Sequence, residues 1–79
     1  MYNKNTKILI TGGAGFIGTN LVSYFLSSGN NVLNLDISYP KIASHFPSWL
    51  KVDIRNSQSV LKAFSKFSPD FVIHLAART

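Results

Sequence analysis

The chain of 79 residues contains no cysteine, so neither a disulfide nor a thiolate metal site can stabilise it. No apolar stretch approaches the length of about 18 residues that a membrane-spanning helix requires. The polar N-terminus also lacks the apolar core of a secretion signal. These absences are compatible with the cytosol, and we expect a cytoplasmic protein without a membrane partner.

Runs of charge are missing as well. The formal net charge is +5, but the eight lysines and arginines are scattered along the chain. This scatter argues against a nucleic-acid partner and leaves attraction of small anionic ligands open. His45 and His74 have no acidic cluster near them, so we expect no metal site. We expect His45 to be solvated in a loop and His74 to be a buried, hydrogen-bonded structural residue.

The pattern of apolar residues predicts alternating strands and helices. With 46% hydrophobic and 14% charged residues, the composition is that of one small folded domain. Apolar runs predict strands over about 7–11, 31–35, 50–53 and 71–76. Helical spacing predicts one helix over about 15–28 and another that ends near Phe67, with Asn56 or Ser57 as its N-cap. Only a short helical turn is expected within 41–46.

This alternation indicates an α/β fold with a doubly wound sheet of four parallel strands. Right-handed crossovers would place the strands in the order 3-2-1-4, with helices on both faces. The crevice between the first and fourth strands would then be the switch point at which ligands bind to such sheets.

A glycine-rich turn joins the first predicted strand to the first predicted helix. Gly12, Gly15 and Gly18 have the spacing and context of a phosphate-binding turn. Gly12 would allow the tight turn, Gly15 the approach of a pyrophosphate, and Gly18 close packing of the helix on the strand. The start of the helix would present unpaired N–H groups to the anion.

An acidic residue ends the second predicted strand, since Asp36 lies 18 residues after Gly18. An aspartate in this place binds a ribose 2′-hydroxyl and repels a 2′-phosphate. Because no arginine follows Asp36 directly, we predict NAD rather than NADP. The alternative is an exposed aspartate at a strand end that binds no ligand.

Three local patterns make the chain similar to a known family, the extended short-chain dehydrogenases/reductases. The resemblance is to the NAD-dependent epimerases and dehydratases of nucleotide sugars within it. The patterns are Thr-Gly-Gly-Ala-Gly-Phe-Ile-Gly at 11–18, Val-Asp-Ile-Arg at 52–55 and His-Leu-Ala-Ala at 74–77. The likeness covers nearly all of this chain and about the first quarter of a family member. It implies the N-terminal part of an NAD-binding Rossmann domain, without a substrate domain.

The resemblance implies specific roles for residues in all three patterns. Asp53 would accept a hydrogen bond from the adenine amino group, with Ile54 near the ring. Capping of the following turn and helix is an equally open role for Asp53. The family often has glycine where Val52 stands and asparagine where Ile37 stands. The residues expected to bind the cofactor are Gly12, Gly15, Phe16, Ile17, Gly18, Asp36, Asp53, Ile54, Leu75, Ala76 and Ala77.

These expectations give a prediction of function. The chain would bind the adenosine and pyrophosphate of NAD as a portion of a nucleotide-sugar epimerase or dehydratase. It would not catalyse alone, because the family's catalytic Tyr-x-x-x-Lys has no counterpart among its 79 residues. The alternatives are a stand-alone module that binds NAD or a related adenine nucleotide, and a truncated remnant without useful affinity. The open edge of the strand at 71–76 predicts self-association, or docking with the remainder of an enzyme.

Overall fold

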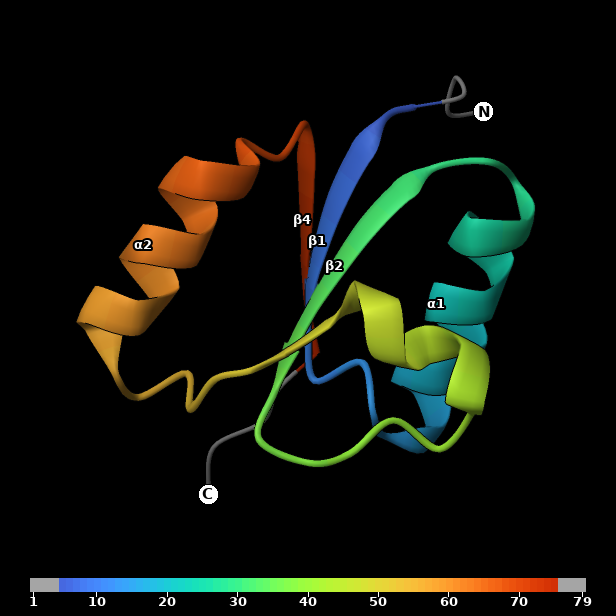
Figure 1. Cartoon of the computed structure of the whole chain (residues 1–79), viewed down its shortest axis with the longest axis horizontal. Coiled ribbons are helices and arrows are strands. Elements are labelled where there is room, and N and C mark those ends of the chain that lie inside the picture. The colour runs from blue at the N-terminus through green and yellow to red at the C-terminus, as the bar shows by residue number, and fades with distance from the viewer. Residues whose placement is uncertain (1–4, 76–79) are drawn as a thin grey trace.

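The computed structural model describes residues 5–75, in which strands and helices alternate along the chain (Figure 1). The first two strands flank the first helix, and a 3-10 helix precedes the third strand. The elements in chain order are β1 (Lys7–Thr11), α1 (Phe16–Ser27), β2 (Asn31–Asp36), η1 (Ala43–Ser48), β3 (Trp49–Lys51), α2 (Ser57–Phe67) and β4 (Phe71–His74).

The four strands form one parallel sheet in the order β3-β2-β1-β4. This order confirms the predicted doubly wound arrangement. β1 lies in the middle, where Ile8 is opposite Val32 of β2 and Phe71 of β4. Figure 1 shows α1 and α2 on opposite sides of the sheet, as right-handed crossovers require.

The core is divided between the two faces of the sheet because successive residues of β1 point to opposite sides. Ile8 and Ile10 are fully buried against Val22 and Phe25 of α1. Leu9, between them in sequence, packs instead into a second cluster on the α2 side. The buried members of that cluster are Leu9, Leu35, Val52 and Ala63.

The helix ends follow the local signals in the sequence. The side chain of Asn56 accepts a hydrogen bond from the Ser59 N–H at 3.1 Å, which confirms one of the two predicted N-caps of α2. Gly29 follows α1 with φ of 82°, the left-handed conformation that ends helices at glycine. Local capping therefore sets the start of α2 and the end of α1.

Two predicted strands are longer than the observed ones. β3 ends at Lys51 rather than at residue 53, because its partner β2 ends at Asp36, which lies opposite Lys51. β4 ends at His74 rather than at residue 76. Ala76 and Ala77, both predicted to contact the cofactor, lie outside the described residues. The short helical turn expected at 41–46 is the 3-10 helix η1, which includes Pro47.

The histidine predictions need correction. His45 is not solvated: it is only 3% exposed, and its Nε2 lies 3.0 Å from the Ser23 hydroxyl of α1. The reason is that η1 folds back onto α1. His74 is hydrogen-bonded through Nδ1 to the Thr11 hydroxyl, as expected. It is exposed rather than buried, because β4 is an edge strand.

Neither helix between residues 5 and 75 is long enough to cross a membrane, since the longer one, α1, has 12 residues. Within the same range, no group of three or more histidine, cysteine, aspartate or glutamate side chains could hold a metal ion.

The buried histidine makes stability depend on pH. Burial lowers the pKa of His45 below its ordinary value of 6.5. Below about pH 6.5 the unfolded chain therefore binds a proton that the folded chain resists. We expect the free energy of unfolding to fall as the pH drops from 7 through 6.5, measured by urea denaturation. His45→Gln should flatten this dependence. A variant as pH-sensitive as the unmodified chain would contradict the assignment.

Candidate nucleotide-binding site

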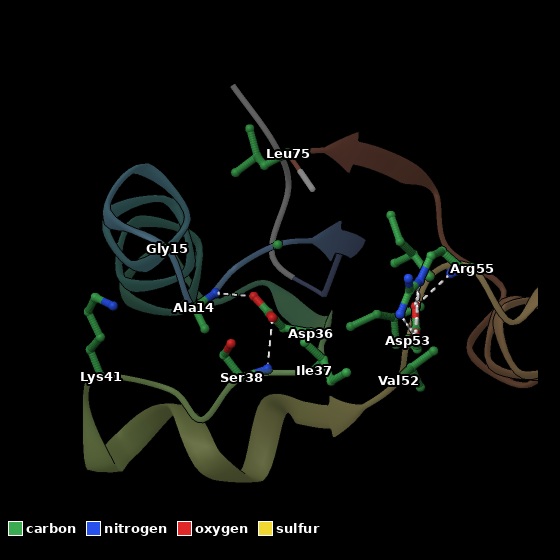
Figure 2. Close-up of a pocket in the computed structure, with 13 residues that line it drawn as sticks. Ala14, Gly15, Asp36, Ile37, Ser38, Lys41, Val52, Asp53, Arg55 and Leu75 are labelled. Carbon is green, nitrogen blue, oxygen red and sulfur yellow. Dashed lines mark hydrogen bonds and ion pairs between the residues drawn. The ribbon is translucent and has the colours of Figure 1, made fainter. Parts of the chain in front are cut away.

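A hollow of about 580 Å³ opens at the carboxyl ends of β1 and β2, beside the start of α1 (Figure 2). In open parallel sheets this edge is where ligands bind. Its wall combines the glycine turn, the end of β2, the loop before η1 and the segment after β3. The lining residues are Gly12, Ala14, Gly15, Leu35, Asp36, Ile37, Ser38, Lys41, Val52, Asp53, Ile54, Arg55 and Leu75.

A second hollow of about 360 Å³ adjoins the first and shares Gly12, Gly15 and Leu75 with it. Its other walls come from the first turn of α1, where the side chains of Phe16 and Ile17 are 80% and 64% exposed. The two hollows together bring nine of the eleven residues predicted from the sequence to one place. These are Gly12, Gly15, Phe16, Ile17, Gly18, Asp36, Asp53, Ile54 and Leu75.

Gly12 and Gly18 each require glycine, for different reasons. Gly12 has φ of 80°, which side chains rarely tolerate. A Cβ on Gly18 would lie 2.4 Å from the Gly12 carbonyl oxygen and 2.5 Å from the Gly13 Cα. Gly18 thus lets the helix start pack against the turn, where we had expected contact with the strand.

Gly15 differs from these glycines because the fold leaves room for a side chain. A Cβ there would meet only the Gly12 carbonyl oxygen, at an ordinary 3.7 Å. Its φ of −75° suits any residue. Gly15 lines both hollows. A Cβ at Gly15 would therefore take space from a ligand without a clash inside the protein.

Two side chains of β2 hold the turn in place. The amide oxygen of Asn34, a residue only 2% exposed, accepts a hydrogen bond from the Gly13 N–H at 2.7 Å. One carboxylate oxygen of Asp36 accepts from the Ala14 N–H at 2.9 Å. Asn34 is not among the site residues predicted from the sequence. Its signal was a polar residue within the apolar run 32–35, two positions before Asp36 and so on the same face of the strand.

These bonds determine which backbone N–H groups are left to donate a hydrogen bond to an anion. The N–H groups of Gly13 and Ala14 are already used within the protein. In the part of the chain that the structure describes, no side chain caps the N-terminus of α1. The first N–H groups of a helix have no partner inside it and carry the positive end of its dipole. The start of α1, at 16–18, is therefore the donor set that faces the second hollow.

Asp36 has capacity left for a ligand. Its second carboxylate oxygen accepts from the Ser38 N–H at 2.9 Å, so each oxygen takes one backbone hydrogen bond. An ionised carboxylate offers about four acceptor positions, which leaves about two for hydroxyl groups. The Trp49 indole N–H donates to the Asp36 carbonyl oxygen at 2.9 Å and fixes the backbone behind the carboxylate.

Asp53 caps the turn after β3, which was one of the two roles left open for it. Its carboxylate accepts from the Arg55 N–H at 2.9 Å and pairs with the guanidinium at 2.7 Å. The hydrogen bonds that the guanidinium donates to the Asp53 carboxylate, together with the negative charge of Asp53, raise the pKa of Arg55. Both residues line the larger hollow. A contact between Asp53 and adenine stays a prediction.

A parallel sheet with a glycine turn and a strand-end acid at its ligand-binding edge is the arrangement typical of dinucleotide-binding α/β folds. The family model described as the NAD dependent epimerase/dehydratase family matches residues 8–79, and the chain belongs to that family.

Individual relatives agree with this assignment. A probable dTDP-glucose 4,6-dehydratase of Sinorhizobium fredii is 44% identical, over 92% of this chain and 23% of the relative. A CDP-paratose 2-epimerase of Salmonella typhi is 38% identical, over 91% of this chain and 24% of the relative. A short chain dehydrogenase from Leptospira borgpetersenii, solved with bound NAD+, superimposes with a TM-score of 0.85 at 30% identity. That match covers 96% of this chain and 33% of the other. This chain thus spans about a quarter of the length of the two curated relatives.

The different surroundings of Gly15 and Gly18 lead to a test. Gly15→Val should lower the free energy of unfolding by about 1 kcal/mol, as is usual when an apolar residue replaces glycine at an N-cap. It should nevertheless abolish nucleotide binding. Gly18→Val should destabilise the chain by roughly 1–3 kcal/mol or more, because its Cβ overlaps backbone. Urea denaturation and nucleotide titration by NMR measure the two effects. Unchanged nucleotide affinity in folded Gly15→Val would remove the argument for a phosphate-binding turn.

Proposed function

We propose that this chain binds the adenosine and pyrophosphate of NAD, as the cofactor-binding portion of a nucleotide-sugar epimerase or dehydratase. The observation that carries the proposal is the continuous surface formed by Gly15, the start of α1 and Asp36. The start of α1 would receive the pyrophosphate, and the free acceptor positions of Asp36 would receive the ribose hydroxyls.

The relatives support the choice of cofactor and reaction class. The similar Leptospira enzyme holds NAD+, and the curated relatives are a dehydratase and an epimerase of sugar nucleotides. When bound, NAD would supply hydride transfer. The residues of this chain would bind and orient it. The Tyr-x-x-x-Lys pair expected of the family is absent from the 79 residues, so we expect no turnover by the chain alone.

A second candidate is a stand-alone module that binds an adenine nucleotide without chemistry. The larger hollow favours it, because described residues from Gly12 to Leu75 form its walls, from the glycine turn to the segments after β3 and β4. A remnant without useful affinity is the third candidate. A cytoplasmic location remains part of the proposal.

Binding without turnover can be measured directly. The chain should bind NAD weakly, and ADP-ribose and AMP should compete, because the described residues would contact the adenosine and its 5′-phosphates. Asp36→Ala should weaken NAD binding about tenfold or more, since it removes charged acceptors from the ribose and loosens the turn at Ala14. Ligand-detected NMR provides the affinities.

One control variant and two contradicting outcomes make that result specific. Asp70→Ala removes a carboxylate that accepts from the Lys7 N–H and lines neither hollow, so it should leave NAD affinity unchanged. No adenine signal transfer with the unmodified chain would count against NAD binding. Measurable epimerase or dehydratase turnover would refute the non-catalytic part.

We also propose that the chain associates with itself or with further protein at the β4 side of the sheet. β4 is an edge strand, and Val72 lies opposite Leu9, which places it on the face that α2 covers. Val72 is 47% exposed, and Leu61 and Phe64 of α2 are 64% and 42% exposed. Exposed apolar side chains beside an edge strand offer a further chain apolar surface next to open backbone hydrogen-bonding groups.

Self-association predicts an apparent mass that rises with concentration in light scattering. Val72→Lys should reduce this rise, because it places a charge on the exposed edge strand. Ser27→Lys, which adds the same single charge at an exposed position at the end of α1, on the other side of the sheet, serves as a control for general electrostatic effects. A monodisperse monomer at every concentration would contradict self-association.

A further inference from the structure

Two cations line the larger hollow, and they differ in whether their charge is already neutralised. Arg55 is paired with Asp53 at 2.7 Å. Lys41 comes from the loop between β2 and η1 and is exposed. Across residues 5–75, it forms no ion pair with a carboxylate. The charge of Lys41 is therefore available to a ligand.

Lys41 and the ion pair occupy different sides of this hollow. Figure 2 shows Lys41 on the side of Ala14 and Gly15, well away from Asp53 and Arg55. Asp36 is bound to the N–H groups of Ala14 and Ser38. The hollow thus has an acceptor for hydroxyl groups at Asp36 and an unneutralised cation on the side of the glycine turn.

We propose that Lys41 binds a phosphate group of the nucleotide and so selects ligands by their phosphate rather than by their adenosine. The inference rests on the proposed function, because it assumes that a nucleotide occupies this hollow. A lysine ammonium is a compact point charge and a common phosphate partner. The start of α1, which adjoins the same turn, adds the positive end of a helix dipole.

Two phosphates could meet this charge, and lysine would bind either by the same chemistry. One is the pyrophosphate attached at the 5′ position of the adenosine in NAD. The other is a 2′-phosphate, as in NADP. The preference for NAD over NADP rests in part on the absence of an arginine directly after Asp36. Lys41 lies further along the chain, and the loop before η1 returns it to the hollow.

The experiment compares three proteins: the unmodified chain, Lys41→Gln and Lys62→Gln. Lys62 is an exposed lysine of α2 that lines neither hollow, so its variant controls for the loss of one positive charge. The probes are adenosine, 5′-AMP, 2′-AMP and ADP-ribose, titrated by NMR at two salt concentrations. Urea denaturation of each variant checks that the fold is retained.

Lys41→Gln should lower the affinity for at least one phosphate-bearing probe about two- to fivefold, which is the effect typical of an exposed charge pair. It should leave adenosine unchanged and reduce the salt dependence of phosphate binding. Lys62→Gln should match the unmodified chain.

The four probes separate the outcomes. A loss confined to 2′-AMP assigns Lys41 to a 2′-phosphate, and a loss for 5′-AMP and ADP-ribose assigns it to the pyrophosphate. Equal weakening of adenosine, or no weakening of any probe, overturns the role of Lys41 and leaves NAD binding standing. If the unmodified chain binds none of the probes, the proposed function fails and the role of Lys41 fails with it.

Discussion

The candidate site depends on the hydrogen bonds by which β2 holds the turn that follows β1. Asn34 accepts from Gly13, and Asp36 accepts from Ala14, so two successive backbone groups of the turn are held by one strand. Thr11 at the end of β1 lies opposite Leu35, which brings the turn directly over the end of β2. A turn held in this way needs little further ordering when a ligand arrives, and less affinity is lost to conformational entropy.

The same bonds divide the polar groups of the site between structure and ligand. The N–H groups of Gly13 and Ala14 donate to side chains within the protein. The N–H groups at the start of α1 have no side-chain cap and are open to a ligand. Asp36 serves both purposes, since each of its oxygens takes one backbone donor and keeps further acceptor capacity. Asp53 and Arg55 form an ion pair, so their charges largely neutralise one another. The sheet thus contributes a rigid acceptor, and the helix contributes an electropositive end.

The sequence by itself determined the architecture and most of the residues at the candidate site. The continuous apolar run at 8–10 indicates a strand that is buried on both faces, and the helical spacing of Val22 and Phe25 indicates a helix that packs on one of them. The structure has both features. The glycine spacing and the acid at the end of the second strand are local signals, readable without a fold. Strand order followed because parallel strands joined by helices have few permitted arrangements.

Only the tertiary structure decided how the loops meet these elements. His45 looked solvated in sequence, yet η1 buries it against Ser23 of α1. Asn34 and Lys41 belong to no recognised sequence motif. Only the fold brings Asn34 to the glycine turn and Lys41 to the larger hollow. Loop paths and edge-strand exposure depend on contacts between residues far apart in the chain. Local periodicity does not encode such contacts, whereas it does encode which residues form a strand or a helix.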